Sequence, residues 1–294
     1  MKNDMLKFLV TILLFGVLLL VCDRGVALLE NKLYAVQENK INYVNEDTVA
    51  DVVILGSSRA SHHYVPQILM DSLNMTCVNL GEDGQGILYN YIIAQALLAK
   101  HTPRVIIYEF GSRDYVESIG DDIEPLSMAL GENEVYNRII EAVKPNFKKA
   151  TSMFHSYRYN SRVHKVLMNT KEVAAPLYGY EPLYGSKKDG TKIKQLAKGD
   201  VIDTYKVEIM KEFIQLCKEK GVLLIGVSSP RYGVSGKIGQ DLSTSLFVDA
   251  SVPYFDYTAA TFDTELFIDN GHLNDEGAVW FSSRIASELK KILQ

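Results

Sequence analysis

The longest apolar stretch of the chain lies at its N-terminus, where Phe8–Cys22 contains only one hydroxyl group and one glycine among its apolar side chains. Lysines precede this run, and Asp23 and Arg24 end it. A helix of this length rises about 22 Å, which is short of the roughly 30 Å hydrocarbon core of a bilayer. Adding Leu6, and letting Lys7 extend toward the headgroups, brings the run near the lower limit for a membrane span.

Three other interpretations of this run fit the sequence less well. A cleaved signal peptide would need small residues directly after the run, and a lipoprotein would need a small residue before Cys22, where Val21 stands. A buried core helix is the remaining interpretation, yet nothing amphipathic marks a face that would pack on a core. We therefore interpret residues 1–25 as an uncleaved, single-pass signal anchor, followed by a polar stalk over residues 26–48. The leading lysines predict a cytoplasmic N-terminus and an extracytoplasmic main domain.

Further along the chain, short apolar runs alternate with longer segments of helical periodicity. Five runs are continuous, β-branched and bounded by turn residues, as in strands buried on both faces: Asp51–Leu55, Thr76–Leu80, Val105–Phe110, Val222–Val227 and Val252–Tyr257. Helices are predicted over Ile87–Lys100, Thr204–Lys220 and Asp275–Leu293. This alternation predicts an α/β fold with a five-stranded parallel sheet covered on both faces. No repeat or flexible linker interrupts the chain after Asp51, so we expect one domain over residues 49–294.

Composition narrows the classes of protein that this pattern allows. With 47% hydrophobic and 23% charged residues among 294, the chain is too apolar to be disordered. Its 31 basic and 36 acidic residues give a net charge of −5 without a basic block, which argues against a nucleic-acid partner. The three cysteines cannot form a disulfide framework, and we predict no disulfide. The fold must therefore rest on an ordinary hydrophobic core.

Polar residues follow the strands at their carboxyl ends, where sites form in parallel sheets. The first predicted strand runs into Gly56-Ser57-Ser58, which presents an exposed hydroxyl, although a helix-capping serine or an anion site gives the same pattern. The second strand leads to glycines at positions 81 and 84, where a backbone N–H can approach a ligand oxygen or the chain can simply turn. On these features alone, capping and turn formation are the more common explanations.

A carboxylate and an imidazole stand three residues apart before the last predicted helix. Asp269 is close enough to hold His272 in one tautomer, which leaves the far ring nitrogen to take a proton from a serine. We assign the other five histidines to surface or packing roles, with His62 and His63 least certain because they lie near Ser58. No pattern of metal ligands such as CxxC or HExxH is present, and we expect neither a metal nor a cofactor.

Together these blocks resemble the SGNH (GDSL-type) hydrolase superfamily, in the order in which that superfamily carries them. The resemblance implies a flavodoxin-like three-layer α/β/α fold with Ser58 as nucleophile, His272 as base and Asp269 as its partner. It also implies an oxyanion hole from the Ser58 amide and from Gly84, with Gly81 as the alternative. Arg113 stands where the family has an asparagine donor, and it could donate instead or signal weakened activity.

The G-S-S-R form and the N-terminal anchor resemble the membrane-tethered branch of that superfamily. This implies an esterase, deacylase or acyltransferase that acts on O-acyl groups of a cell-envelope polysaccharide. The alternative is a catalytically weak or inactive protein that uses the same fold to bind polysaccharide or an assembly partner. The segment 115–200, rich in tyrosine and basic residues, is interpreted as a helical insertion that either is simply solvated or forms a substrate-binding lid.

Overall fold

The structure is a computed structural model of the whole chain, and its contacts divide the chain into two compact units. One unit comprises Met1–Asn42 with Ile123–Glu172, and the other comprises Tyr43–Asp122 with Val173–Gln294. The description that follows covers residues 2–35, 40–45, 50–111, 114–116, 121–130, 133–159, 178–186, 201–232, 238–258 and 263–294. Each unit is described by itself.

The second unit is built on a five-stranded parallel sheet, which confirms the sheet expected from the apolar runs. Its strands are β1 (Val52–Gly56), β2 (Cys77–Asn79), β3 (Val105–Glu109), β4 (Leu223–Ser228) and β5 (Tyr254–Asp256). They are paired in the order β2-β1-β3-β4-β5, and all four pairings are parallel. In this order β2 lies on one side of β1 and β3 on the other, so the strand order reverses between β1 and β3. Ligands of such sheets bind at the carboxyl ends of the strands at this point.

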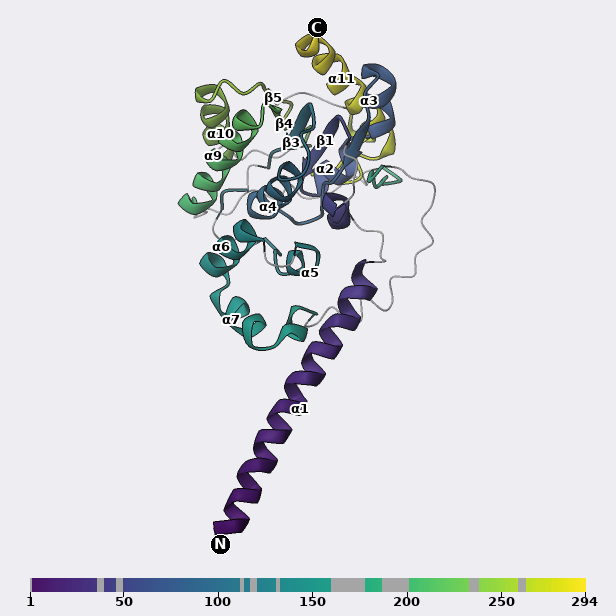
Figure 1. Cartoon of the computed structure of the whole chain (residues 1–294). Helices are drawn as coiled ribbons and strands as arrows, with labels where there is room; N and C mark the ends of the chain where they lie inside the picture. The colour runs from purple at the N-terminus through teal and green to yellow at the C-terminus, as the bar shows by residue number, and fades with distance from the viewer. Residues whose placement is uncertain are drawn as a thin grey trace. The chain divides into compact units, whose positions relative to one another are not determined.

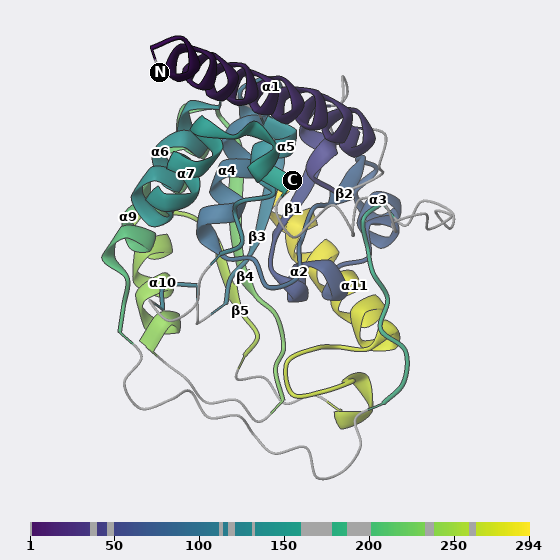
Figure 2. The same ribbon diagram turned by 90° about the horizontal axis from the view of Figure 1, so that it is seen from below.

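Helices cover both faces of the sheet and complete three layers (Figure 2). The helices of one face are α2 (Ser58–His63), α3 (Pro66–Leu73) and α11 (Asp275–Leu293). Those of the other are α4 (Ile87–Leu98), α9 (Thr204–Glu219) and α10 (Ile238–Asp249). The long predicted helices thus form at nearly the predicted bounds, because their apolar stripes have a sheet face to cover.

On the side of α3 and α11, alternate residues of the strands point toward these helices and form a core with them. Val52, Ile54 and Ile107 of the sheet belong to one cluster with Leu69 of α3 and Phe281 of α11, all of them 0% exposed. On the other side α4 is apolar around nearly its whole circumference, and eleven of its twelve residues are buried. A helix of this composition must be enclosed by protein or by lipid.

The first unit begins with α1 (Lys2–Ala35), a single continuous helix drawn in purple in Figure 1. Within it, Asn3–Glu30 is long and apolar enough to cross a membrane, with a mean hydropathy of 2.7 and none of its most apolar window buried. At the end of the apolar run, Asp23 accepts hydrogen bonds from the amides of His155 and Ser156 at 2.9 and 3.0 Å. The Asp23 carboxylate is therefore satisfied by backbone amides of the same unit, whereas an unpaired carboxylate would be costly to place in lipid.

The rest of this unit is helical where it is described. Its helices are α5 (Leu126–Leu130), α6 (Glu134–Val143), α7 (Pro145–Met153) and the short 3-10 helix η2 (His155–Tyr159). They fall in the segment predicted as a helical insertion, although residues 160–177 and 187–200 of that segment lie outside the described residues. Helix α1 continues to Ala35, through part of the stretch interpreted as a stalk. The division into anchor, stalk, domain and lid stays a prediction.

Candidate active site

The turn after β1 places two serines at the carboxyl end of the sheet. Gly56 has φ +144°, and a Cβ atom there would lie 2.8 Å from the Glu109 carbonyl oxygen and 2.9 Å from the Ala60 Cβ. Only glycine fits this tight passage between strand and helix. Ser57 occupies the N-cap position of α2, yet its side chain makes no capping hydrogen bond. The hydroxyl groups are thus not explained by helix capping.

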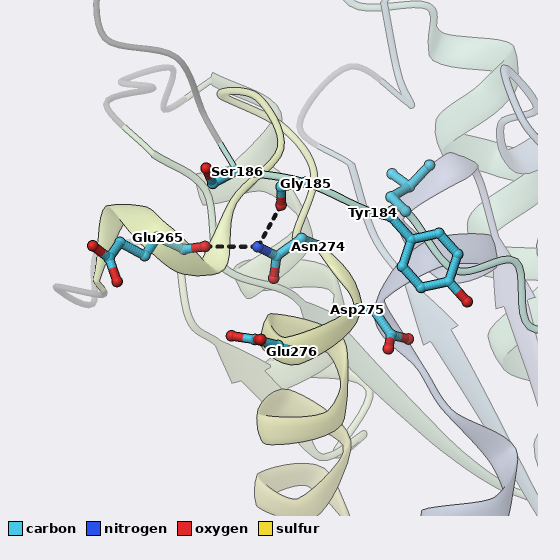
Figure 3. A pocket seen from close by; sticks show the side chains of 8 residues that line it. Tyr184, Gly185, Ser186, Glu265, Asn274, Asp275 and Glu276 are labelled. Carbon is cyan, nitrogen blue, oxygen red and sulfur yellow. Dashed lines mark hydrogen bonds between the residues drawn. The ribbon is translucent and has the colours of Figure 1, made fainter.

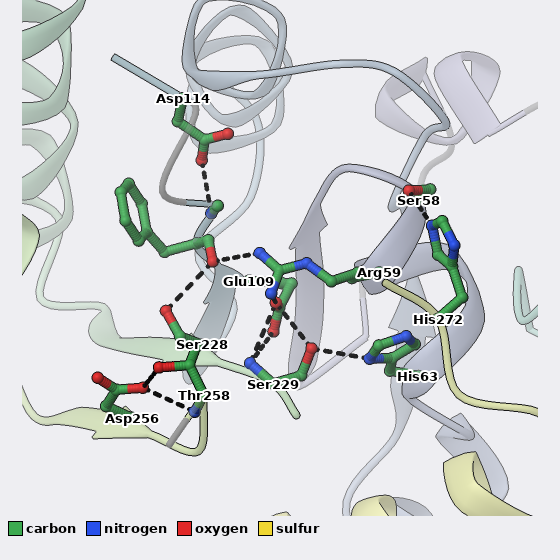
Figure 4. Close-up of polar contacts among 12 residues, drawn as sticks. Ser58, Arg59, His63, Glu109, Asp114, Ser228, Ser229, Asp256, Thr258 and His272 are labelled. Atoms are coloured by element: carbon green, nitrogen blue, oxygen red, sulfur yellow. Dashed lines mark hydrogen bonds and ion pairs between the residues drawn. The ribbon is translucent and has the colours of Figure 1, made fainter. Parts of the chain in front are cut away.

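Ser58, His272 and Asp269 lie in a hydrogen-bonded line, part of which Figure 4 shows. The Ser58 Oγ lies 2.7 Å from His272 Nε2, and His272 Nδ1 lies 3.0 and 3.1 Å from the two carboxylate oxygens of Asp269. A carboxylate only accepts, so Nδ1 carries the ring proton and Nε2 is left to accept the hydrogen of Ser58. Residues 214 positions apart are therefore arranged for proton transfer from a hydroxyl group.

Backbone amides of the loop that carries Asp269 keep this carboxylate ionised. Asp269 Oδ1 accepts the amides of Gly271 and His272 at 2.6 and 2.9 Å, a local turn that explains the three-residue spacing. Burial raises the pKa of Asp269, but the hydrogen bonds from His272 and Gly271 outweigh it and lower the pKa to about 2. The Asp269 side chain is 48% exposed and that of His272 28%, so the group is ionised and accessible from solvent.

A glycine-containing loop after β2 faces Ser58. The Asn79 side chain donates to the carbonyl oxygens of Ala60 and Tyr64 at 2.7 and 3.0 Å and accepts the Gly81 amide at 2.9 Å. The Gly81 amide is therefore already engaged. Gly84 has φ +75° and borders the same cavity as Ser58, and its amide donates to no acceptor among the described residues. Of the two glycines considered as oxyanion donors, Gly84 is the one whose N–H is available.

The cavity beside Ser58 has a volume of about 220 Å³, and glycines and polar or charged residues line it. It is bordered by Ser57, Ser58, Arg59, Gly84, Gln85, Gly86, Gly111, Asp114, Asp121, Lys206 and Arg231. Burial raises the pKa of Asp114 to about 7, although this carboxyl accepts the Gly111 amide and the Tyr108 hydroxyl, each at 3.0 Å. Arg113, the residue at the position of the family's asparagine, lies outside the described residues.

Behind the site lies a set of side chains that the sequence analysis missed, which we call the buried polar cluster. It comprises Arg59, His63, Glu109 and Ser229, which Figure 4 labels, together with Tyr64. Arg59 Nη1 lies 3.1 Å from Glu109 Oε1 and its Nη2 donates to the Phe110 carbonyl at 2.6 Å. The hydroxyl groups of Ser229 and Tyr64 also donate to Glu109. A carboxylate at the end of an otherwise apolar strand, and serines at the end of the next, were signals that could have found it.

Two neighbouring histidines on α2 stand edge-on to the His272 ring, with ring centroids 5.8 Å away for His62 and 6.2 Å for His63. His62 Nδ1 lies 2.7 Å from the Glu181 carbonyl oxygen and Nε2 lies 3.2 Å from Asp83 Oδ1. Both partners are acceptors, so both nitrogens donate, as only the cationic ring can. Burial lowers the pKa of His62, yet the bonds to Asp83 and Glu181 raise it overall. Both acceptors and the raised pKa therefore favour the protonated form of His62 beside His272.

A larger cavity, of about 520 Å³, opens at the start of α11 (Figure 3). Asn274 is the N-cap of this helix, and its side-chain oxygen accepts the Gly277 amide at 2.9 Å. Its amide group donates to the carbonyl oxygens of Gly185 and Glu265. Asn274 thus joins the loop that follows His272 to Tyr178–Ser186. In the described part of the chain, no group of three or more His, Cys, Asp or Glu side chains is arranged to hold a metal.

With this geometry established, the chain can be set beside known proteins. No protein-family model matches it, and no curated protein matches it in sequence. Its fold is similar to that of GDSL-type lipases and esterases over about 80% of its length, at low identity. One is a protein of the G-D-S-L family from Desulfitobacterium hafniense, with 11% identity, a TM-score of 0.45 and 80% and 97% of the two chains covered.

Two enzymes give comparable values. For the psychrotrophic esterase EstA from a Pseudoalteromonas species, the identity is 10% and the TM-score 0.46, with 82% of this chain and 97% of the other covered. For a lipase/acylhydrolase from Enterococcus faecalis, the identity is 10% and the TM-score 0.42, with 82% and 95% covered. The roles assigned to residues below rest on the contacts of the site itself.

Proposed function

We propose that this protein is a serine esterase or acyltransferase in which Ser58 is the nucleophile, His272 the general base and Asp269 the group that orients and stabilises it. The observation that carries the proposal is the continuous line from the Ser58 hydroxyl through His272 to Asp269, at 2.7 and 3.0 Å. Hydrogen-bond reach between nucleophile, base and orienting carboxylate is the geometric requirement of this chemistry.

The first half of the reaction follows from the proton positions. His272 Nε2 takes the hydroxyl proton of Ser58 as the Oγ attacks the ester carbonyl carbon, and the new C–O bond places a negative charge on the former carbonyl oxygen. Collapse of this intermediate breaks the bond to the leaving alcohol, which receives the proton from His272. An acyl group is then bound to Ser58, and Asp269 has remained ionised throughout.

The second half returns the enzyme to its starting state. Water, in a hydrolase, or a sugar hydroxyl, in a transferase, gives its proton to His272 and attacks the acyl carbon. Through both halves the oxyanion is held by the backbone N–H groups of Ser58 and Gly84. Ser58 begins α2 and Gly84 adopts positive φ beside the same cavity, which supports this pair of donors. The proposal includes Arg113 as a third donor, because it stands where the family has an asparagine donor.

We further infer that the substrate is an O-acylated carbohydrate of the cell envelope and that the protein acts while anchored in a membrane. The exposed apolar helix over Asn3–Glu30 supports an N-terminal anchor, with the N-terminus cytoplasmic and the site extracytoplasmic. The polysaccharide is what the sequence resemblance to the membrane-tethered branch implies. Release of acetate from acetylated polysaccharide, compared with a simple acetyl ester, tests this part of the proposal.

Covalent labelling tests the chemistry directly. The full-length chain in detergent micelles should react with a fluorophosphonate probe, and peptide mass spectrometry should find the probe on Ser58. Ser58→Ala should abolish labelling, whereas Ser283→Ala, which removes an exposed hydroxyl from α11, should leave it unchanged. Labelling that survives Ser58→Ala would remove Ser58 from this role. A wild-type chain that never labels would favour a protein that binds polysaccharide or an assembly partner without catalysis.

A further inference from the structure

His63 stands at the end of α2 with both ring nitrogens engaged and no exposed surface. Its Nε2 receives the backbone amide of Leu273, with a nitrogen–nitrogen distance of 2.9 Å. Its Nδ1 lies 2.7 Å from Ser229 Oγ. One ring therefore joins α2, the end of β4 and the loop that carries His272, which are far apart in the sequence.

The direction of every proton in this contact is fixed by chemistry. A backbone amide can only donate, so Nε2 carries no proton and Nδ1 carries the single one. The Ser229 hydroxyl accepts from Nδ1 and donates its own hydrogen to Glu109 Oε1 at 2.8 Å. Glu109 is in turn paired with Arg59. The chain of donors thus runs one way, from the Leu273 amide to a buried carboxylate.

The same arrangement keeps His63 neutral. Burial, together with the positive charges of Arg59 and Arg231, lowers its pKa well below the ordinary histidine value. A second proton on Nε2 would also point at the Leu273 N–H and break the only bond that the ring makes to this loop. His63 therefore stays an acceptor where His62, one residue earlier, is a double donor.

Helix α2 is only six residues long, with Ser58 at its first position and His63 at its last. Leu273, whose amide His63 receives, directly follows His272 and is itself 0% exposed. Ser58 and His272 must exchange a proton, and the same short helix holds both: Ser58 as part of it, and His272 through the bond of Leu273 to His63. An error of about 1 Å in such an alignment can cost roughly a hundredfold in rate.

We propose that His63 is a positioning residue of the site: by accepting the Leu273 amide it holds His272 at hydrogen-bond distance from Ser58. The expected effect of His63 on the labelling rate rests on the proposed function. Its expected effect on the Leu273 amide does not. The competing explanation is a buried, satisfied histidine that contributes only to stability.

Two near-isosteric variants separate these explanations. In His63→Gln the amide oxygen can take the place of Nε2 and still accept from Leu273. In His63→Asn the amide nitrogen can take the place of Nδ1 and still donate to Ser229, but no acceptor reaches Leu273. Tyr64→Phe is the control. It removes a buried hydroxyl group next to His63 that donates to Glu109 and not to the loop that carries His272.

Each full-length variant in micelles is measured in three ways: the rate constant of fluorophosphonate labelling, the midpoint of urea unfolding, and the hydrogen exchange rate of the Leu273 amide. We expect labelling about tenfold or more slower in His63→Asn, within about threefold of wild type in His63→Gln, and within about twofold in Tyr64→Phe. Exchange at Leu273 should be at least about tenfold faster in His63→Asn than in His63→Gln.

Equal labelling rates in the Asn and Gln variants, or rates that simply follow the unfolding midpoints across all three variants, would overturn the positioning role. Equal exchange rates at Leu273 would overturn the hydrogen bond itself. If wild type does not label at all but the exchange rates differ as expected, the proposed function fails while the contact of His63 with the loop stands.

Discussion

Two groups of polar side chains lie next to each other at the carboxyl ends of the strands, and they differ in almost every respect. The line of Ser58, His272 and Asp269 is partly open to solvent, with side chains of His272 and Asp269 that are 28% and 48% exposed. In the buried polar cluster the Arg59 and Glu109 side chains are 4% and 0% exposed. One group is accessible to a substrate, and the other is closed to it.

The difference shows how a fold supports reactive groups. In the open line, protons can move because His272 has one nitrogen that faces a hydroxyl and one that is held by a carboxylate. In the buried cluster, the hydroxyl groups of Ser229 and Tyr64 both donate to Glu109, which is also paired with Arg59, so a shift of either proton breaks a bond inside the protein. The rigid group holds the backbone from which the reactive group projects. Apart from His63, whose bond to the Leu273 amide reaches the loop that carries His272, changes in the buried cluster should therefore affect stability more than labelling.

The largest effect is expected from Asp269→Asn in the open line. The new amide donates toward His272 Nδ1, which favours the wrong ring tautomer and leaves Ser58 without an acceptor. Labelling by a fluorophosphonate should slow by about 10²- to 10⁴-fold, and the urea midpoint should change little. Asp263→Asn is the matched control, since Asp263 caps a short helix in the same stretch of chain and its side chain accepts the Glu265 amide at 3.0 Å. A comparable loss in both variants would contradict the assignment.

The next effect is expected from Glu109→Gln in the buried cluster. It leaves the buried Arg59 cation without its counter-charge, which costs about 3–5 kcal/mol in known cases. Urea unfolding of the full chain should show this loss. Glu208→Gln, which breaks the exposed pair with Lys211, should cost less than about 1 kcal/mol. If the two variants have the same midpoint, the cluster is not the rigid support described here.

Gly84→Ala tests the loop that faces the open line. The added Cβ would meet no atom within 4 Å, so its whole effect comes from forcing a side chain into the φ +75° conformation. We expect a loss of about 1–2 kcal/mol in stability, or relaxation of the loop with slower labelling. Gly221→Ala is matched to it, with φ +67°, open space and a position after α9. It should lose similar stability and label at the wild-type rate, and slower labelling there would contradict the oxyanion assignment.

The smallest effect is the difference in pH dependence between the groups. The pKa of His63 is lowered in the folded protein. As the pH falls below about 6.5, this histidine takes up a proton in the unfolded chain but not in the folded one, and the folded state therefore loses stability. The folded pKa of Asp269 is also lowered, to about 2, and its contribution is lost only between about pH 4 and 2. His63→Gln should therefore remove roughly 1 kcal/mol of the loss between pH 6.5 and 5.5, measured by urea unfolding. Parallel curves for wild type and variant would show that His63 is not held neutral.

Much of the fold could be predicted because its signals are local. Continuous β-branched runs predicted all five strands, and three- and four-residue apolar spacing predicted Asp275–Leu293 at its observed bounds. Strand ends were less certain: β5 covers only Tyr254–Asp256 of the predicted Val252–Tyr257. A run of apolar residues marks burial, but where pairing stops depends on the neighbouring strand.

For the site, the residue types and their order can be read from the chain alone: a glycine-serine turn after β1, glycines after β2 and an Asp-x-x-His turn before α11. Which of these residues meet, and what holds them, depends on the folded arrangement, because the partners are far apart in the chain. Glu109 could be read as one charge in an apolar strand, and His62 and His63 as a neutral pair. Their pKa values shift in opposite directions because His62 faces acceptors at Asp83 and Glu181, whereas His63 is buried and receives the Leu273 amide. No spacing rule brings those groups together; the packing of α2 against the loop that carries His272 does.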